Sequence, residues 1–154
     1  MRLKITDEQM NDTKSRWLAA VRQKGLALRA APEEMKGDRE LCTAAVAEDG
    51  RTLEFASQEM KGDRELCMAA VAQNGQALQH CSKETKGDET IVTTALQNAH
   101  GDVIGIFLKA SANMKNNERI VLVAMQATTY KRGIWDILST DMQAKTSVRK
   151  AAGM

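Results

Sequence analysis

Two residue pairs in this sequence combine side-chain types that could support nucleophilic or redox chemistry. His80 and Cys81 are adjacent and could form a thiol–imidazole dyad. Neighbouring residues of a helix point in different directions, however, and no third group that would orient the imidazole is evident. Cys42 and Cys67 are 25 residues apart and form no CxxC motif. We therefore expect neither pair to be a catalytic or metal site.

Packing is the simpler interpretation of the cysteines. The sequence repeats with a period of 25 residues, and Cys42 and Cys67 occupy the same position of this repeat. Trp17 and Val92 occupy the equivalent positions of the neighbouring repeats. The position therefore selects an apolar side chain, and free cysteine is a common buried residue. His100, which precedes a glycine, is expected at the end of a helix.

Aspartates recur at a fixed spacing and could be mistaken for a carboxylate cluster. Asp38, Asp63 and Asp88 are each 25 residues apart, which places one in each repeat, where we expect it to cap a helix. The sequence contains no P-loop, HExxH, GxSxG, GxGxxG or EF-hand motif. We predict no catalytic residue, no metal site and no cofactor, and we expect that the protein is not an enzyme.

The elements that hold these residues are short repeats. Residues 38–62 and 63–87 are identical at 15 of 25 positions without a gap. Self-similarity of this length is typical of proteins built from stacked repeats. The register extends in both directions and defines units 13–37, 38–62, 63–87 and 88–116, a partial unit 117–127 and a half repeat 5–12. That half repeat is either a cap or the second half of a unit within a longer array.

One unit illustrates the expected structure. Asp38 caps a helix whose apolar positions recur at helical spacing. Gly50 then ends this helix in a left-handed conformation, which predicts positive φ at Gly25, Gly50 and Gly75. A second helix follows, and Ser57 opens a last short turn through Met60. Such a hairpin cannot bury its own apolar face, so neighbouring units must cover it.

We therefore predict an all-α, solenoid-like stack of helical hairpin repeats in a single domain, residues 1–154. The stack should be irregular in the fourth unit, where four extra residues around 100–107 predict a longer helix, 102–112, capped by Asp102. It should also be irregular at the C-terminus, where residues 128–154 leave the register. There we expect a capping helix that contains Trp135, Ile137 and Leu138, then a basic final segment capped by Thr140 or Asp141.

The units resemble a known domain of unknown function, a tandem helical-hairpin repeat found in microbial eukaryotes, algae included, and in some intracellular bacteria. The residues that carry the resemblance are Asp38-Arg-Glu-Leu-Cys-Thr-Ala-Ala-Val46, Gly50, Leu53, Ala56-Ser57 and Lys61-Gly62-Asp63, with Ala19-Ala-Val-Arg-Gln-Lys-Gly25 as an equivalent. The resemblance covers roughly residues 5–127. The family has no assigned activity, so the resemblance implies helical repeats and nothing about catalysis. The departures are Pro32 in place of the usual serine, the 29-residue fourth unit and the unmatched C-terminus.

Charge and composition indicate where in the cell the protein is expected. The net charge is +2, with basic ends and a unit 38–62 that carries a net charge of −3. The longest apolar run, residues 103–108, is much shorter than the roughly 20 residues of a membrane span, and the N-terminus lacks the apolar core of a signal peptide. With three cysteines, we expect a reducing intracellular compartment, either the cytoplasm or, after removal of a transit peptide, the interior of a chloroplast or mitochondrion.

Aromatic and basic residues near the two ends are the candidates for contact with a partner. Trp17 either closes the end of the stack or contacts a partner. Trp135 either packs a capping helix or lies at an interface with its aromatic and basic neighbours. The cations of the final segment, Lys145, Arg149 and Lys150, either form a solvated face or dock on acidic protein, lipid headgroups or phosphate. The candidates are Trp17, Tyr130, Lys131, Arg132, Trp135, Lys145, Arg149 and Lys150.

These observations favour a non-catalytic scaffold or protein-interaction subunit, an accessory part of a larger assembly. Its partners would be other protein subunits, and a peripheral place in an organellar membrane complex is a narrower form of the same hypothesis. The alternative is a nucleic-acid-binding repeat module that uses the basic ends, although the acidic middle unit argues against a continuous basic face.

Overall fold

The computed structural model describes residues 7–154, and every regular element in that range is helical. Most are α-helices, and four, labelled η, are 3-10 helices. The elements are α1 (Asp7–Gln23), η1 (Gly25–Ala30), α2 (Glu33–Lys36), α3 (Arg39–Glu48), η2 (Gly50–Phe55), α4 (Gln58–Gly62), α5 (Arg64–Gln73), η3 (Gly75–His80), η4 (Thr85–Gly87), α6 (Glu89–Gln97), α7 (Val103–Lys109), α8 (Ala112–Lys115), α9 (Glu118–Ala127), α10 (Lys131–Trp135), α11 (Thr140–Ala144) and α12 (Thr146–Ala152).

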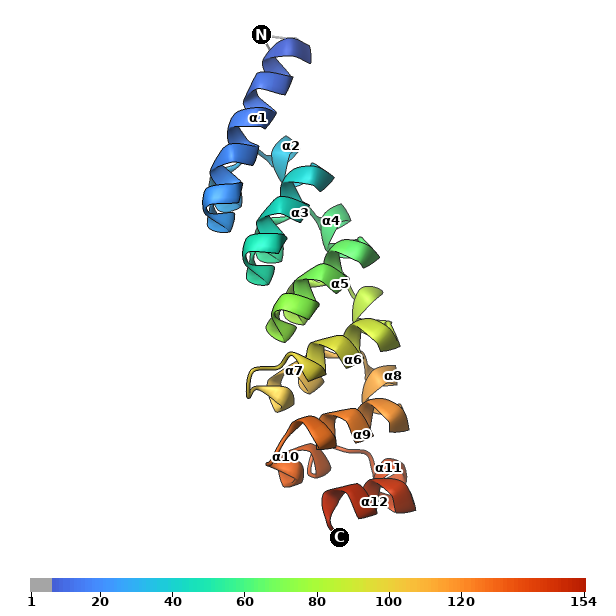
Figure 1. Cartoon of the computed structure of the whole chain (residues 1–154). Coiled ribbons are helices and arrows are strands. Elements are labelled where there is room, and N and C mark those ends of the chain that lie inside the picture. The colour runs from blue at the N-terminus through green and yellow to red at the C-terminus, as the bar shows by residue number, and fades with distance from the viewer. Residues whose placement is uncertain (1–6) are drawn as a thin grey trace.

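The helices form a layered stack with the two chain ends at opposite ends (Figure 1). Each layer begins with a first helix, and α1, α3, α5, α6, α9 and α12 follow one another along the long axis. A second segment and a short third turn complete the layers that begin with α1, α3, α5, α6 and α9. Backbone hydrogen bonds join consecutive layers: Ser57 N donates to Lys36 O, and Ser82 N donates to Lys61 O, both at 2.9 Å. The predicted all-α repeat stack is confirmed.

Aspartate caps start α3, α5 and α6, as predicted. The side chain of Asp38 accepts a hydrogen bond from Leu41 N at 3.0 Å, and the side chain of Asp63 accepts one from Leu66 N at 2.9 Å. Asp88 does the same for Ile91 N at 3.1 Å. These bonds satisfy amide groups that have no partner within the helix.

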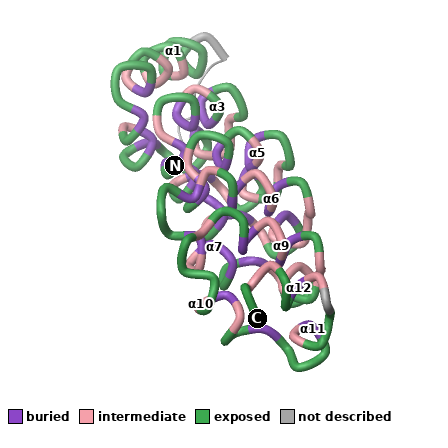
Figure 2. Tube along the Cα trace, turned by 60° about the horizontal axis from the view of Figure 1, so that its bottom comes forward, coloured by how far each residue is buried: buried purple, intermediate pink, exposed green. Residues whose placement is uncertain are grey.

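The core runs between the layers and fills two recurrent positions of the first helices. At the first, which we call the Leu41 position, Leu41, Leu66, Ile91, Ile120 and Val148 are all buried. At the next, the Cys42 position, Cys42, Cys67, Val92 and Val121 are buried too. From α3 onward, buried stretches alternate with exposed ones (Figure 2). Each layer thus buries the apolar face of its neighbour.

The prediction of positive φ at Gly25, Gly50 and Gly75 is wrong. In the described residues, positive φ occurs only at His100, Gly101 and Gly153. The three repeat glycines are instead the first residues of η1, η2 and η3. A β-carbon on Gly25 would lie 2.8 Å from Ala45 O of the next layer, and those on Gly50 and Gly75 would lie still closer to the corresponding carbonyl oxygens. These glycines permit close approach between layers.

The second segments differ between units. In the first three they are six-residue 3-10 helices, and Asp49 and Asn74 cap two of them through Arg51 N and Gln76 N. In the fourth unit the extra residues allow an α-helix, α7, which Asp102 caps through Gly105 N at 3.0 Å, as predicted. The helix ends at Lys109 rather than at residue 112, because Ala110 is extended and Ser111 caps α8.

The C-terminal segment is irregular, as expected, yet it repeats the order of elements of the earlier units. It contains three short helices rather than a single capping helix and a tail. Ser139, and neither Thr140 nor Asp141, caps α11 by accepting from Met142 N, as Ser111 accepts from Met114 N. Lys145, without a side-chain cap, precedes α12, which packs against α9.

The N-terminal helix is continuous where a boundary between a half repeat and a unit was expected. The helix α1 passes through residues 12 and 13 without a break. Thr13 lies at the position of the capping aspartates, but its hydroxyl donates backward to Gln9 O at 2.8 Å and so caps nothing. Residues 5 and 6 of the expected half repeat lie outside the described residues.

Candidate functional site

The cysteines at the Cys42 position lie in the core. The thiols of Cys42 and Cys67 each donate to a carbonyl oxygen of the preceding turn, Lys36 O and Lys61 O, at 3.1 Å. Burial raises the pKa of the Cys42 thiol to about 11. Because the thiolate is the nucleophile and the metal ligand, the Cys42 thiol, which stays protonated at neutral pH, is suited to neither role. The hydrogen bond with Cys81 lowers the pKa of Cys67, but Cys67 is fully buried.

His80 and Cys81 form no dyad. Cys81 is buried, its thiol lies 3.6 Å from Ala77 O, and the hydrogen bond that it shares with Cys67 raises the pKa of Cys81. His80 is half-buried at the end of η3, and burial lowers its pKa. No hydrogen bond between His80 and Cys81 is found in the described structure.

The other candidates for chemistry are equally dispersed. His100 is exposed in a left-handed turn beyond the end of α6, with φ of 46°. Across residues 7–154, apart from the side chains of Asp7, Glu8 and Thr146, no three His, Cys, Asp or Glu side chains are grouped in a way that could hold a metal ion.

The recurrent carboxylates are joined to cations of a neighbouring layer. Lys14 Nζ lies 2.8 Å from Asp38, Arg39 lies 3.0 Å from Asp63, and Arg64 lies 2.8 Å from Asp88. The hydrogen bond from Arg64 lowers the pKa of Asp88, and the amides of Ile91 and Thr90 add to the effect. Two further pairs, Arg119–Glu89 at 3.2 Å and Lys145–Glu118 at 2.9 Å, extend this ion-pair ladder to the last layer.

A recess of about 680 Å³ lies between α1 and α3, beside the first ion pairs of the ladder. Its walls include Lys14 and Arg39 together with Asp38 and Glu40. Lys14 already pairs with both carboxylates, Asp38 and Glu40, at 2.8 and 3.0 Å. These three charged side chains of the recess are therefore committed to one another rather than free to hold a small ligand.

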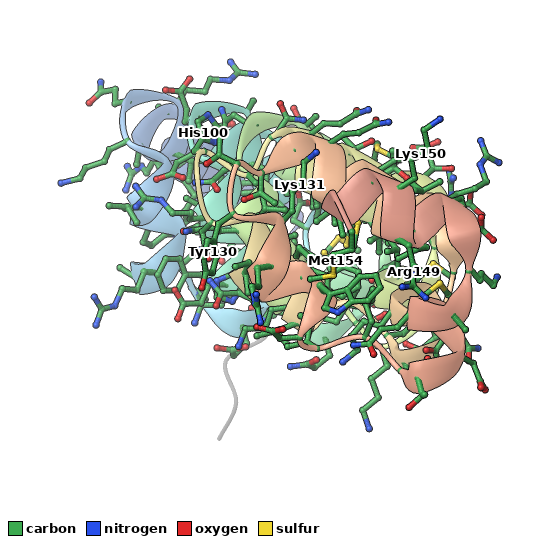
Figure 3. The ribbon with its side chains drawn as sticks, turned by 90° about the horizontal axis from the view of Figure 1, so that it is seen from below. His100, Tyr130, Lys131, Arg149, Lys150 and Met154 are labelled. Carbon is green, nitrogen blue, oxygen red and sulfur yellow. The ribbon has the colours of Figure 1, made fainter. Side chains whose placement is uncertain are left out.

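The predicted partner-contact residues lie at opposite ends of the stack. Trp17 is half-buried in α1, packs against the core, and lines a shallow recess with Thr13, Arg16 and Ala20. All the others lie in the last two layers, so Trp17 cannot share a compact site with them. Seen from the C-terminal end, Tyr130, Lys131, Arg149, Lys150 and Met154 lie around that end of the molecule (Figure 3).

Three of the C-terminal candidates already have contacts within the protein. Trp135 is half-buried against the core, and its carbonyl accepts from Gln143 Nε2 at 2.8 Å. Lys145 belongs to the ladder, and Arg132 of α10 lies 4.0 Å from Asp136, the residue after the end of this helix. Lys131, Arg149 and Lys150 are exposed, and no ion pair reaches them from the described side chains.

Two apolar residues of the last two layers, one expected to pack and one not considered, are exposed. Ile137 was expected to be an apolar contact but is 39% exposed, whereas Leu138 is buried. Met154 is 53% exposed. Only the order of elements, with α11 and α12 repeating α8 and α9, could have signalled that these residues lie at the end of the stack.

Comparisons with known proteins point to a repeat family. A family described as Domain of unknown function (DUF4116) matches residues 16–61 and 63–105, together more than half of the chain. The matches run from α1 to α4 and from α5 into α7, so each takes in two layers of the stack. No curated protein and no solved structure shows significant similarity. Among the helices of residues 7–154, none has the length and apolar character needed to cross a membrane.

Proposed function

The chain belongs to the DUF4116 family, and from this premise we propose that it is a non-catalytic scaffold that binds other protein subunits of a larger assembly. A narrower form of the proposal is a peripheral place in an organellar membrane complex. The three buried thiols suit a reducing compartment, the cytoplasm or the interior of an organelle.

One observation carries the proposal: the side chains that could do chemistry are already used to build the stack. The aspartates cap helices and pair across layers, and the cysteines fill the core. A stack of this kind offers an extended surface, which is how helical repeats generally bind partners.

A nucleic-acid-binding module is less well supported. Its affinity would depend on a continuous row of cations along the molecule. In the ladder, however, cations alternate with carboxylates from layer to layer, from Lys14–Asp38 through Arg64–Asp88. Exposed cations outside the ladder are scattered over the described layers, for example Lys24 near the N-terminal end, Lys83 in the middle and Lys150 near the C-terminal end.

The test is affinity purification of the native protein at low and high salt, followed by mass spectrometry and by reconstitution from purified components. The expected result is a stoichiometric set of subunits that survives high salt and reassembles with the recombinant chain. Recovery of the chain alone, or with nucleic acid that is lost at high salt, would contradict the scaffold role.

A further inference from the structure

One layer in the middle of the stack differs from its neighbours in the core. In the layer that begins with α5 (Figure 1), the side chains of Cys67 on α5, Cys81 after η3 and Thr85 in η4 are all buried. At the last two of these positions, the layers that begin with α1, α3 and α6 carry an alanine and a methionine, namely Ala31 and Met35, Ala56 and Met60, and Ala110 and Met114. Among these four layers, only the one that begins with α5 carries two cysteines.

The two thiols of this layer are in contact with each other and with the threonine. Cys67 and Cys81 share a hydrogen bond, and Sγ of Cys67 lies 3.9 Å from the hydroxyl of Thr85. That hydroxyl is held in place because it donates to the carbonyl oxygen of Ser82 at 3.1 Å. A direct contact between two thiols is the starting geometry from which a disulfide, with an S–S bond of about 2.05 Å, can form.

We propose that Cys67 and Cys81 are a reversible oxidation site, which forms a disulfide within one layer when the protein meets hydrogen peroxide. The bond joins α5 to the residue after η3 and closes a loop of about 15 residues, so it holds the two segments of this layer together. A thiol reductant such as glutathione reverses the reaction. The inference goes beyond the scaffold role and does not depend on it, because it concerns the core of the stack and no partner.

Hydrogen peroxide is the only co-reactant that the oxidation needs. Cys67 loses its proton, its thiolate attacks one peroxide oxygen, and the O–O bond breaks with loss of hydroxide, which takes up that proton as water. The sulfur of Cys81 then attacks the sulfur of the resulting sulfenic acid. The S–O bond breaks, and the hydroxyl group leaves as water with the proton of the Cys81 thiol. Each sulfur is oxidised by one electron, and the peroxide is reduced to two water molecules.

The contact between the two cysteines distinguishes their roles. The hydrogen bond with Cys81 lowers the pKa of Cys67, and the same bond raises the pKa of Cys81. Because the thiolate is the nucleophile, Cys67 is the sulfur that attacks the peroxide, and Cys81 is the sulfur that resolves the sulfenic acid. Cys42 has Ala56 at the equivalent position of its own unit, and burial raises its pKa to about 11. Cys42 should therefore remain a thiol.

Burial makes this oxidation slow. Cys67 is fully buried and Cys81 is 5% exposed, so peroxide reaches the pair only when a covering segment opens. The covering segments are the six-residue η3 and the three-residue η4, and short 3-10 segments should open before the α-helices of the stack. Local opening therefore limits the rate, and the pair resists brief treatment with a thiol reagent but reacts with peroxide over hours.

Peroxide treatment of the 154-residue chain, followed by peptide mapping without reductant, tests the inference. The expected product is a monomer in which one bond joins Cys67 to Cys81, Cys42 is a free thiol, and dithiothreitol restores the original mass. Hydrogen exchange of the untreated chain measures how often η3 opens, so that the incubation covers many openings. Free thiols at Cys67 and Cys81 after that time, a sulfinic acid on Cys67, or a bond to Cys42 would overturn the proposal.

Two cysteine variants supply the matched comparison, because each removes one buried thiol. Cys81→Ala gives its unit the alanine that the sister unit has at Ala56, which is also 5% exposed, and should abolish the disulfide. Cys42→Ala should leave disulfide formation unchanged. Thermal unfolding verifies that both variants fold. Equal loss of the product in the two variants, or its persistence in Cys81→Ala, would overturn the proposal.

The disulfide should also change the opening of its own layer. Amide hydrogens of residues 63–87 should exchange about tenfold more slowly in the oxidised chain than in the reduced chain, because the bond restricts opening of this layer. Residues 13–37, two layers away, should show a smaller change. Equal exchange of residues 63–87 in the two forms would overturn the assignment of the bond to these segments. Affinity purification does not enter these measurements, so this inference and the scaffold role fail separately.

Discussion

The α-carbon of Gly50 faces the carbonyl oxygen of Ala70 in the next layer so closely that a β-carbon would overlap it. Gln73 strengthens the same junction, because its carboxamide accepts from Gly50 N and donates to Ala47 O at 2.6 Å. The glycine of each regular unit therefore sets the distance between layers, and the stack depends on it at every step.

Gly50→Ala should destabilise the protein by about 2 kcal/mol, because the added methyl group would force two backbones apart. Gly62→Ala is the matched control, since the nearest atom to its β-carbon would be Ser82 Oγ at 4.0 Å. Gly62→Ala should be neutral or slightly stabilising. Urea unfolding of both variants measures the difference, and equal effects would contradict the close-approach role.

Asp63→Ala should cost about 1 kcal/mol, chiefly through loss of the cap on α5. Asp63 also pairs with Arg39 at 3.0 Å, a contribution that is smaller because the arginine is largely exposed. Asp63→Asn keeps an oxygen that can cap Leu66 N but removes the charge, so it should cost less than Asp63→Ala. If the two substitutions cost the same in chemical denaturation, the cap is not the main contribution.

The stability that Asp88 contributes should disappear in acid. Its pKa lies below the ordinary 3.8 because the carboxylate accepts hydrogen bonds from Arg64 and from the amides of Ile91 and Thr90. The unfolded state therefore binds a proton more readily, and the contribution is complete above about pH 4 and declines as the pH falls through the lower folded-state pKa. Urea unfolding from pH 7 to pH 3 should show the gap between wild type and Asp88→Asn narrowing below pH 4. A gap that stays constant would mean that the ionised carboxylate contributes nothing.

The three cysteines should resist alkylation in the folded protein. All are buried, and at pH 8 the Cys42 thiol, with a pKa of about 11, is protonated. Iodoacetamide followed by mass spectrometry should therefore find little modification in buffer and three modified cysteines in denaturant. Ala47→Cys places a thiol at an exposed position of α3 and should be alkylated rapidly without denaturant. Rapid alkylation of Cys42 in buffer would contradict this prediction, because it would show that the core opens readily.

The local elements could be predicted from the sequence. The 25-residue period, the caps at Asp38, Asp63 and Asp88, and the apolar positions around Leu41 follow from helical spacing and from side-chain bonds that span only a few residues. The interpretation of Cys42 as a packing residue, and of Asp102 as the cap of the longer second segment, rested on the same local reasoning.

Only the tertiary structure decided the features that depend on which residues meet across layers. A glycine after a helix has two physical explanations, left-handed backbone and close approach, and the neighbouring Ala70 carbonyl selects the second at Gly50. Likewise, Lys145 reads as part of a basic tail in the sequence, but the packing of α12 on α9 brings it to Glu118. The spacing of residues in the sequence determines what each layer can bury, whereas the contact between layers determines which charged side chains are paired.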